Sequence, residues 1–266
     1  PTDTSADTHA TALNESATRG RCRRLAIALP GRRQQYMTSV TIVVVEKTIG
    51  VYFWQRLTML DVLGPHQFLG YVPEFTVVTF AKTKDPVVTD TGVRLIPDYD
   101  FSTCPPLDIL LVGGGNPLAE MEDKEVISFL GEAGHGAEYV TSVCTGALIL
   151  AEAGLLDGYQ ATTHWAYKEL LERGYPEVTV ADGRVVTDRN RITGGGVTAG
   201  LDFALTLIGQ LTNPNTAANV QLVTEYDPKP PINYGSPDTA PAELVAAVRE
   251  SIAQSRLAEF IAAKAG

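Results

Sequence analysis

Apolar residues along the chain alternate between short runs and longer stretches with helical spacing from about residue 40 onward. The runs TIVVVE, IGVYF, FTVVTFA (75–81), DILLVGGG (108–115) and AEYVTSV (137–143) are rich in β-branched and aromatic residues, which predicts strands. Helical spacing is typical of 123–134, 145–156 and the strongly apolar VTAGLDFALTLIGQL. Apolar strands that alternate with helices predict an α/β fold, a mostly parallel sheet with helices on both faces.

The C-terminal third adds two further patterns. RVVTD and NRITGGG predict a β-hairpin. The Pro-rich segment 225–241 is followed by one predicted amphipathic helix over 243–265, with apolar residues at positions 244, 245, 248, 252, 257, 260 and 261. We interpret this part as a tail that lies over its own domain, with a dimer contact as the alternative.

Residues 1–39 differ from the rest of the chain. They are rich in Thr, Ser, Ala and Arg and show little hydrophobic periodicity, which predicts a disordered extension. The apolar stretch LAIAL is too short for the core of a secretory signal, while a transit peptide and an extension ahead of a start near Met37 both stay open. No Pro/Gly/Ser linker divides residues 40–266, so we expect a single α/β domain there.

Charge and cysteine content narrow the functional classes. The net charge is −10, and residues 1–39 carry six arginines against three acidic residues, so the remainder is more acidic still. Such a surface repels phosphate backbones and anionic lipids, which argues against nucleic-acid and membrane partners. Three cysteines without a CxxC spacing argue against a disulfide framework and a structural zinc site. We expect a cytoplasmic protein, with organelle targeting by residues 1–39 left open.

The segment YVTSVCTGALILAEAGLL (139–156) places Cys144 between a predicted strand and a predicted helix. A side chain at such a turn projects from the carboxyl end of the sheet, where open α/β folds bind their ligands. The positive end of the following helix favours thiolate over thiol, which predicts a lowered Cys144 pKa and a nucleophile. The alternative is a small apolar residue that fills the core.

Two side chains are candidates for the proton-handling partner of this cysteine. Asp61 lies between apolar neighbours, which raises a carboxyl pKa and suits a general acid; alternatively it is the N-cap of a helix that opens near Pro65. His164, in ATTHWAY, follows Cys144 by 20 residues at the end of the next short strand. It either shares the cleft with Cys144 or is a buried structural residue beside Trp165.

Two glycine clusters complete the candidates. In LVGGGNP, which ends at Pro117, the backbone N–H groups of a strand-end turn are suited to face developing negative charge. The glycines of NRITGGGVTAG (190–200) do not follow the GxGxxG order and come after a predicted hairpin. We interpret this second cluster as structural.

The chain from about Thr41 onward resembles the ThiJ/PfpI superfamily, which is related to the glutamine amidotransferases. The similarity rests on LDVLGPHQFL (60–69), CPPLDILLVGGG (104–115), the cysteine segment 139–156, ATTHWAYKELL (161–171), ITGGGVTAGLDFALTL (192–207) and EYDPKPPINYGSPDTAP (225–241). The last segment in particular is similar to the isonitrile (isocyanide) hydratase subgroup. The resemblance implies a flavodoxin-like, doubly wound fold, a homodimer, and no metal or organic cofactor.

The same resemblance implies roles for individual residues. Cys144 is the nucleophile, held in a strained backbone conformation, and Asp61 is its acidic partner. The Thr145 hydroxyl and N–H line the site. The remaining positions are the glycine pair opposite the sulfur, Gly114 and Gly115, and His164, which is not required as a base in the hydratases.

The activity that the resemblance implies is hydration of an isocyanide to an N-substituted formamide. Thr145, where peptidase-like members carry His, counts against proteolysis, and the late His-x-Glu of amidotransferases is absent from the sequence. Two alternatives stay open. One is glyoxalase- or deglycase-like cysteine chemistry on the same scaffold, and the other is a non-catalytic ligand or redox sensor.

Overall fold

The structure, a computed structural model, describes residues 22–25 and 42–265. They belong to two compact units that divide between Glu46 and Lys47. In the first unit, β1 (Cys22–Leu25) pairs antiparallel with β2 (Ile42–Val45). Cys22–Leu25 is thus a strand where the sequence predicts disorder, because the β-branched run of β2 supplies a pairing partner. The other positions of that disorder prediction lie outside the described residues.

Within the described residues, a seven-stranded sheet forms the centre of the second unit, in the order β12-β13-β9-β8-β3-β4-β7. Neighbouring strands are parallel except for the β12–β13 hairpin, which confirms the predicted mostly parallel sheet. The strands are β3 (Lys47–Tyr52), β4 (Phe75–Ala81), β7 (Tyr99–Asp100), β8 (Ile109–Val112), β9 (Tyr139–Val143), β12 (Val185–Asp188) and β13 (Arg191–Gly194). Two short pairs lie outside this sheet: β5 (Val87–Val88) with β6 (Arg94–Leu95), and β10 (Gln160–Ala161) with β11 (Thr179–Val180).

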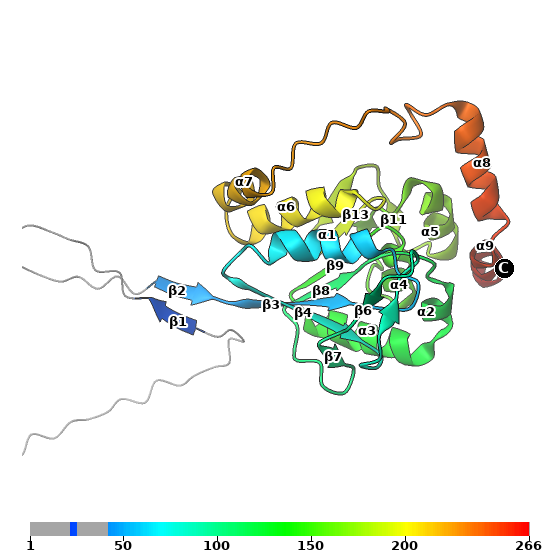
Figure 1. Cartoon of the computed structure of the whole chain (residues 1–266). Helices are drawn as coiled ribbons and strands as arrows, with labels where there is room; N and C mark the ends of the chain where they lie inside the picture. The colour runs from blue at the N-terminus through cyan, green and yellow to red at the C-terminus, as the bar shows by residue number, and fades with distance from the viewer. Residues whose placement is uncertain (1–21, 26–41, 266) are drawn as a thin grey trace, which may run out of the picture. The chain divides into compact units, whose positions relative to one another are not determined.

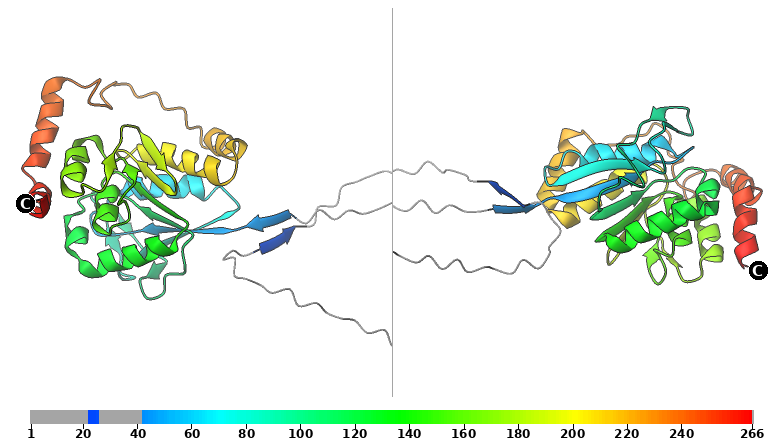
Figure 2. Two further views of the ribbon diagram at one scale, coloured as in Figure 1. Left: turned by 180° about the vertical axis from the view of Figure 1, so that it is seen from behind. Right: turned by 90° about the horizontal axis from the view of Figure 1, so that it is seen from below.

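Helices cover both faces of the sheet, as Figures 1 and 2 show. One face carries α1 (Met59–Leu69) and α6 (Ala199–Leu211), with α7 (Pro214–Val223) packed against α6. The other face carries α2 (Leu118–Glu122), α3 (Lys124–Gly136), α4 (Gly146–Glu152) and α5 (Lys168–Gly174). Every residue of β8 is buried, as a central strand with two covered faces requires. The predicted doubly wound fold is confirmed.

The C-terminal segment forms two helices where the sequence predicts one. α8 (Ala242–Ala253) and α9 (Arg256–Ala265) are separated at Ser255, whose Oγ accepts the N–H of Ala258 at 3.2 Å as a helix N-cap. α9 packs against α5, and α8 lies against the short 3₁₀ helix η1 (Trp165–Tyr167). Leu257 and Ile261 of α9 are buried, so the interpretation as a tail over its own domain is confirmed for α9.

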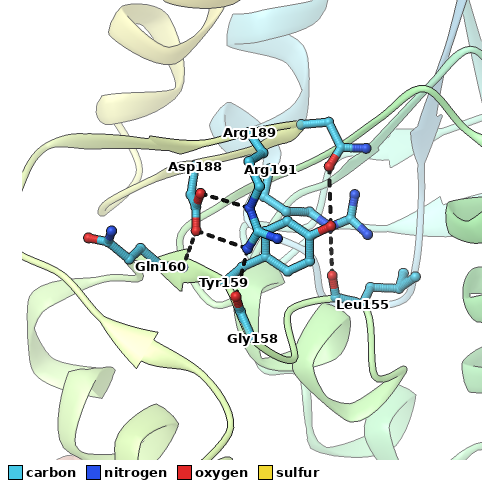
Figure 3. A network of polar contacts seen from close by, with 8 residues as sticks. Leu155, Gly158, Tyr159, Gln160, Asp188, Arg189 and Arg191 are labelled. Atoms are coloured by element: carbon cyan, nitrogen blue, oxygen red, sulfur yellow. Dashed lines mark hydrogen bonds and ion pairs between the residues drawn. The ribbon is translucent and has the colours of Figure 1, made fainter.

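A polar network fixes the amino end of β13 (Figure 3). The guanidinium groups of Arg189 and Arg191 lie 3.7 and 4.4 Å from the centre of the Tyr159 ring. Arg189 Nε also donates to Asp188 at 3.0 Å, and Arg191 Nε donates to the Leu155 carbonyl at 2.6 Å. These contacts join the hairpin turn to the segment after α4. They therefore anchor the strand whose opposite, carboxyl end lies beside Cys144.

Candidate active site

Cys144 lies at the turn between β9 and α4, with 6% of its surface exposed. Its φ of 58° is in the left-handed region, so the predicted strained backbone is confirmed. Three hydrogen bonds hold this conformation. The Cys144 N–H donates to the carbonyls of Gly194 and Gly195 at 3.0 and 2.8 Å, and its carbonyl accepts from the Thr163 hydroxyl at 2.7 Å. The turn is therefore held from two neighbouring segments.

The loop after β8 comes unusually close to this turn because it contains Gly114. A Cβ atom on Gly114 would lie 2.5 Å from the Thr145 nitrogen and 2.8 Å from the Cys144 Cβ. Any side chain at this position would displace the cysteine turn. The glycine run that the sequence places after β8 thus permits the close approach of two sheet ends.

Asp61 lies in the first turn of α1 and is fully buried. α1 begins at Met59, with Thr58 at the N-cap, so the alternative of Asp61 as the N-cap of a helix near Pro65 is wrong. Asp61 Oδ2 accepts the Gly114 N–H at 2.9 Å, while Oδ1 has no conventional hydrogen-bond donor among the described residues. The carboxyl group also interacts with the Cys144 thiol. The structure thus brings together the predicted nucleophile and its acidic partner.

Burial raises the pKa of the Asp61 carboxyl from its ordinary 3.8 to about 7. The hydrogen bonds from Gly114 and Cys144 oppose this rise, and the charge of Asp90 adds to it. Asp90 belongs to the same local network, since its carboxylate accepts from the Thr58 hydroxyl at 2.9 Å. The predicted raised pKa of Asp61 is confirmed in direction, and near neutral pH this carboxyl can both donate and accept a proton.

The predicted lowering of the Cys144 pKa is wrong. Burial, and after it the charge of Asp61, raise the pKa of the thiol well above its ordinary value. The backbone N–H groups of Val197 and Thr145 hydrogen-bond to the sulfur and favour thiolate, but their effect is smaller. The free protein therefore holds a thiol at neutral pH, and its proton has to leave when the sulfur reacts.

The Gly114 loop faces the cysteine turn as predicted, but the Gly114 and Gly115 amides make hydrogen bonds that the sequence does not predict. The Gly114 N–H donates to Asp61, and the Gly115 N–H donates to Thr145 Oγ1 at 2.8 Å. The Thr145 hydroxyl in turn donates to the Gly115 carbonyl at 2.9 Å. Both amides are thus engaged by side chains and do not face an empty position for developing charge. They hold Asp61 and Thr145 in place.

Val197 is a site residue that the sequence interpretation assigned to a structural glycine cluster. It follows Gly194–Gly196, at the carboxyl end of β13, and β13 is the parallel neighbour of β9. Adjacent parallel strands end at the same edge of a sheet, so the turn after β13 reaches Cys144. The adjacency of β13 and β9 would have identified Val197 as a site residue. The glycine spacing in the sequence does not reveal which strands are neighbours.

His164 packs against Trp165 and Tyr167, and among the described residues it makes no hydrogen bond to Cys144 or Asp61. Its ring lies 5.6 Å from Trp165 and 5.7 Å from Tyr167, centre to centre, and its Nδ1 accepts the Ala166 N–H at 3.2 Å. Burial lowers the pKa of His164, which keeps the ring neutral near pH 7. His164 is half-buried, and its ring contacts favour the interpretation as a structural residue.

Tyr167, from the same ATTHWAY segment, was not among the predicted site residues. Burial, and then the charge of Cys144, raise the pKa of its phenol, so the ring lies within electrostatic reach of the sulfur. An aromatic residue beside His and Trp is more typical of a core than of a site, and no sequence signal distinguished the two.

A cavity of about 620 Å³ borders the residues that surround the cysteine, although neither Cys144 nor Asp61 is part of its wall. Its wall includes Thr58, Asp90, Gly115 and Tyr167, which contact or adjoin Asp61 and Cys144, and also Leu257 from α9. The cavity therefore shares wall residues with the surroundings of the Cys144–Asp61 pair and has the size of a small-molecule site.

Among the described residues, no three His, Cys, Asp or Glu side chains converge as a metal-binding group. None of the helices in the described part of the chain is long and apolar enough to cross a membrane.

Several known proteins are similar to this chain in sequence or in fold. An isonitrile hydratase from Pseudomonas putida is 46% identical over 210 residues, which cover 78% of this chain and 90% of that protein. A ThiJ/PfpI family protein from Pseudomonas syringae is 42% identical, with a TM-score of 0.78 over 83% of this chain and 91% of that one. An oxidized DJ-1 from Toxoplasma gondii, 20% identical with a TM-score of 0.61, covers 68% of this chain and 100% of its own, and shares the fold.

The DJ-1/PfpI family model matches residues 47–210, which is more than half of the chain. This range includes the cysteine turn, Asp61, both glycine loops and the Tyr167 segment. The chain belongs to the DJ-1/PfpI family.

Proposed function

We propose that the protein hydrates isonitriles, R–N≡C, to N-substituted formamides, with Cys144 as the nucleophile. The observation that carries the proposal is the similarity to a curated isonitrile hydratase along most of both chains. The Cys144–Asp61 pair beside a small-molecule cavity supports it, because the reaction needs a nucleophile and an adjacent proton carrier.

The first half of the reaction forms a thioimidate on Cys144. The Asp61 carboxylate accepts the thiol proton while the sulfur attacks the terminal carbon of the isonitrile. Asp61 then gives this proton to the same carbon, which yields R–N=CH–S–Cys144. A carboxyl with a pKa of about 7 suits both transfers.

The second half hydrolyses the thioimidate. Water attacks the carbon, and the Asp61 carboxylate accepts a proton from this water. The carbon–sulfur bond of the tetrahedral adduct then breaks and the proton of its hydroxyl group passes to nitrogen, which releases the formamide R–NH–CHO. The departing thiolate regains a proton from Asp61, and the net reaction adds one water to one isonitrile.

The surrounding amides have separate roles in this proposal. The N–H groups of Thr145 and Val197 stabilise the sulfur when it carries negative charge. The Gly114 N–H orients Asp61, and Gly115 fixes the Thr145 hydroxyl. The two glycines thus act on the substrate through the side chains that they position.

The test is formation of the formamide from alkyl and aryl isocyanides, followed by NMR with purified protein. We expect turnover by the wild type and a loss of at least about 10³-fold in Cys144→Ala, because covalent catalysis is removed. Cys104→Ala is the matched control, since Cys104 is half-buried and does not adjoin the site. Equal inertness of the wild type and Cys144→Ala across several isocyanides would overturn the proposal. Lactate from methylglyoxal in the same preparation would favour the glyoxalase alternative.

A further inference from the structure

The proposed hydration adds one hydrogen to carbon and one to nitrogen of the isonitrile. Asp61 supplies the hydrogen on carbon from the thiol and later accepts a proton from water, so it is occupied as a base when water attacks. The nitrogen becomes basic at this same step, because the C=N double bond is lost. A second donor, on the nitrogen side of the thioimidate, would complete the proton transfers.

The geometry of the site limits where this donor can stand. The isonitrile group is linear, so with its carbon at the sulfur the nitrogen and the substituent R extend away from Cys144. Asp61 lies on the buried side, in the first turn of α1 and against the Gly114 loop. The cavity that borders the site through Gly115 and Tyr167 has room for R, and Tyr167 lies in its wall within electrostatic reach of Cys144.

The Tyr167 side chain is held in position while its hydroxyl is left available. Its ring meets the His164 ring edge-on, 5.7 Å between centres, and its N–H donates to the His164 carbonyl at 2.8 Å. The His164 ring is itself in close packing with Gly196, one residue before Val197. The Tyr167 hydroxyl makes no hydrogen bond to any residue in the described part of the chain. Its raised pKa keeps it protonated across neutral pH.

We propose that Tyr167 is a catalytic residue that donates a proton to the isonitrile nitrogen during hydrolysis of the thioimidate. The inference rests on the proposed isonitrile hydration. As water attacks carbon, Asp61 accepts one water proton and the Tyr167 hydroxyl gives its proton to nitrogen, which leaves R–NH–CH(OH)–S–Cys144 and a phenolate. When the carbon–sulfur bond breaks, the adduct hydroxyl returns its proton to the Tyr167 phenolate. Asp61 re-protonates the sulfur, so both groups regain their starting state.

The test compares Tyr167→Phe with the wild type in single turnovers. We expect thioimidate formation at the wild-type rate and a decay about 10²-fold slower, since general acids typically contribute 10²–10⁴-fold. The adduct on Cys144 then accumulates and is visible by intact-protein mass spectrometry, with little change in alkylation of Cys144 by iodoacetamide. A purely structural role would slow both steps alike. Tyr71→Phe is the matched control, because Tyr71 is 48% exposed and remote from the cavity wall.

Each outcome decides between the hypotheses. Unchanged decay of the adduct in Tyr167→Phe, or slowing of its formation instead, overturns the role of Tyr167 and leaves the hydratase proposal standing. A wild type inert to all isocyanides overturns the proposed function itself. If Tyr167→Phe does not fold, 3-fluorotyrosine at position 167 replaces it. Its more acidic phenol should move the alkaline limb of the kcat profile to lower pH, and an unmoved limb overturns the inference.

Discussion

Cys144 and Asp61 titrate as one coupled unit, because the charge of Asp61 raises the Cys144 pKa and the hydrogen bond from the Cys144 thiol lowers the Asp61 pKa. Losing the first proton from the pair leaves a single proton that either the sulfur or the carboxyl can carry. Thiol with carboxylate and thiolate with carboxylic acid are therefore two forms of one protonation state. This removes the apparent conflict between a buried, protonated thiol and a nucleophilic role.

The pH dependence of kcat/KM tests this coupling. The reactive state holds one proton on the pair, and it forms from the doubly protonated state as pH rises through the Asp61 pKa of about 7. We therefore expect kcat/KM for an isocyanide to rise about tenfold per pH unit below this value and to level off above it. Asp61→Asn should remove both the activity and this limb. A profile that falls with pH across the same window would contradict the coupled pair.

The steric role of Gly114 gives a second prediction at the residue scale. In Gly114→Ala the new methyl group would lie 2.5 Å from the Thr145 nitrogen, which the backbone of the cysteine turn cannot relieve without moving. We expect a loss of about 1–3 kcal/mol in the free energy of unfolding and at least tenfold lower kcat/KM. Gly136→Ala at the end of α3 is the matched control, because nothing lies within 4 Å of its added Cβ. Wild-type kcat/KM in Gly114→Ala would show that the turn tolerates displacement.

At the scale of elements, α9 is buried against the domain more deeply than α8, whose Ile252 is only partly buried. Ile261 is fully buried and packs against Gly174 at the end of α5, whereas α8 contributes no buried residue. The break at Ser255 separates the buried helix α9 from the more exposed helix α8. Leu257 of α9 forms part of the cavity wall. The C-terminal element therefore contributes to the shape of the site as well as to the core.

Ile261→Ala measures how strongly α9 is held. Removing a buried isoleucine side chain costs about 2–5 kcal/mol, so we expect the free energy of unfolding in urea to fall by this amount. Leu244→Ala on α8, where the side chain is 48% exposed, is the control and should change stability by less than about 0.5 kcal/mol. Equal effects of the two substitutions would contradict the separate packing of α8 and α9.

At the scale of the whole molecule, the site exists because four parallel strands end at one edge of the sheet. The turns after β3, β8, β9 and β13 contribute Asp61, the Gly114 loop, Cys144 and Val197. These strands are neighbours in the order β13-β9-β8-β3, so the segments that follow them lie close together at one edge of the sheet. The homodimer that the family resemblance implies stays a prediction.

Much of this arrangement could be predicted from the sequence because strand–turn–helix patterns are local. The runs around Cys144 and Asp61 identify two turns at sheet ends, and the structure brings them together. Val197 and Tyr167 escaped prediction because an N–H direction and a ring position depend on how loops from distant strands fold over one another. Nothing in GGGV or HWAY distinguishes these residues from ordinary packing.

The sequence by itself determined the order of strands and helices, the parallel sheet, and the cysteine turn, because hydrophobic periodicity and glycine placement act over a few neighbouring residues. Only the tertiary structure decided the protonation of the site. The local pattern predicted a lowered thiol pKa from one helix end, but burial and the Asp61 charge raise it. Desolvation sums over every atom that surrounds a group, and most of those atoms come from elements far away in the chain.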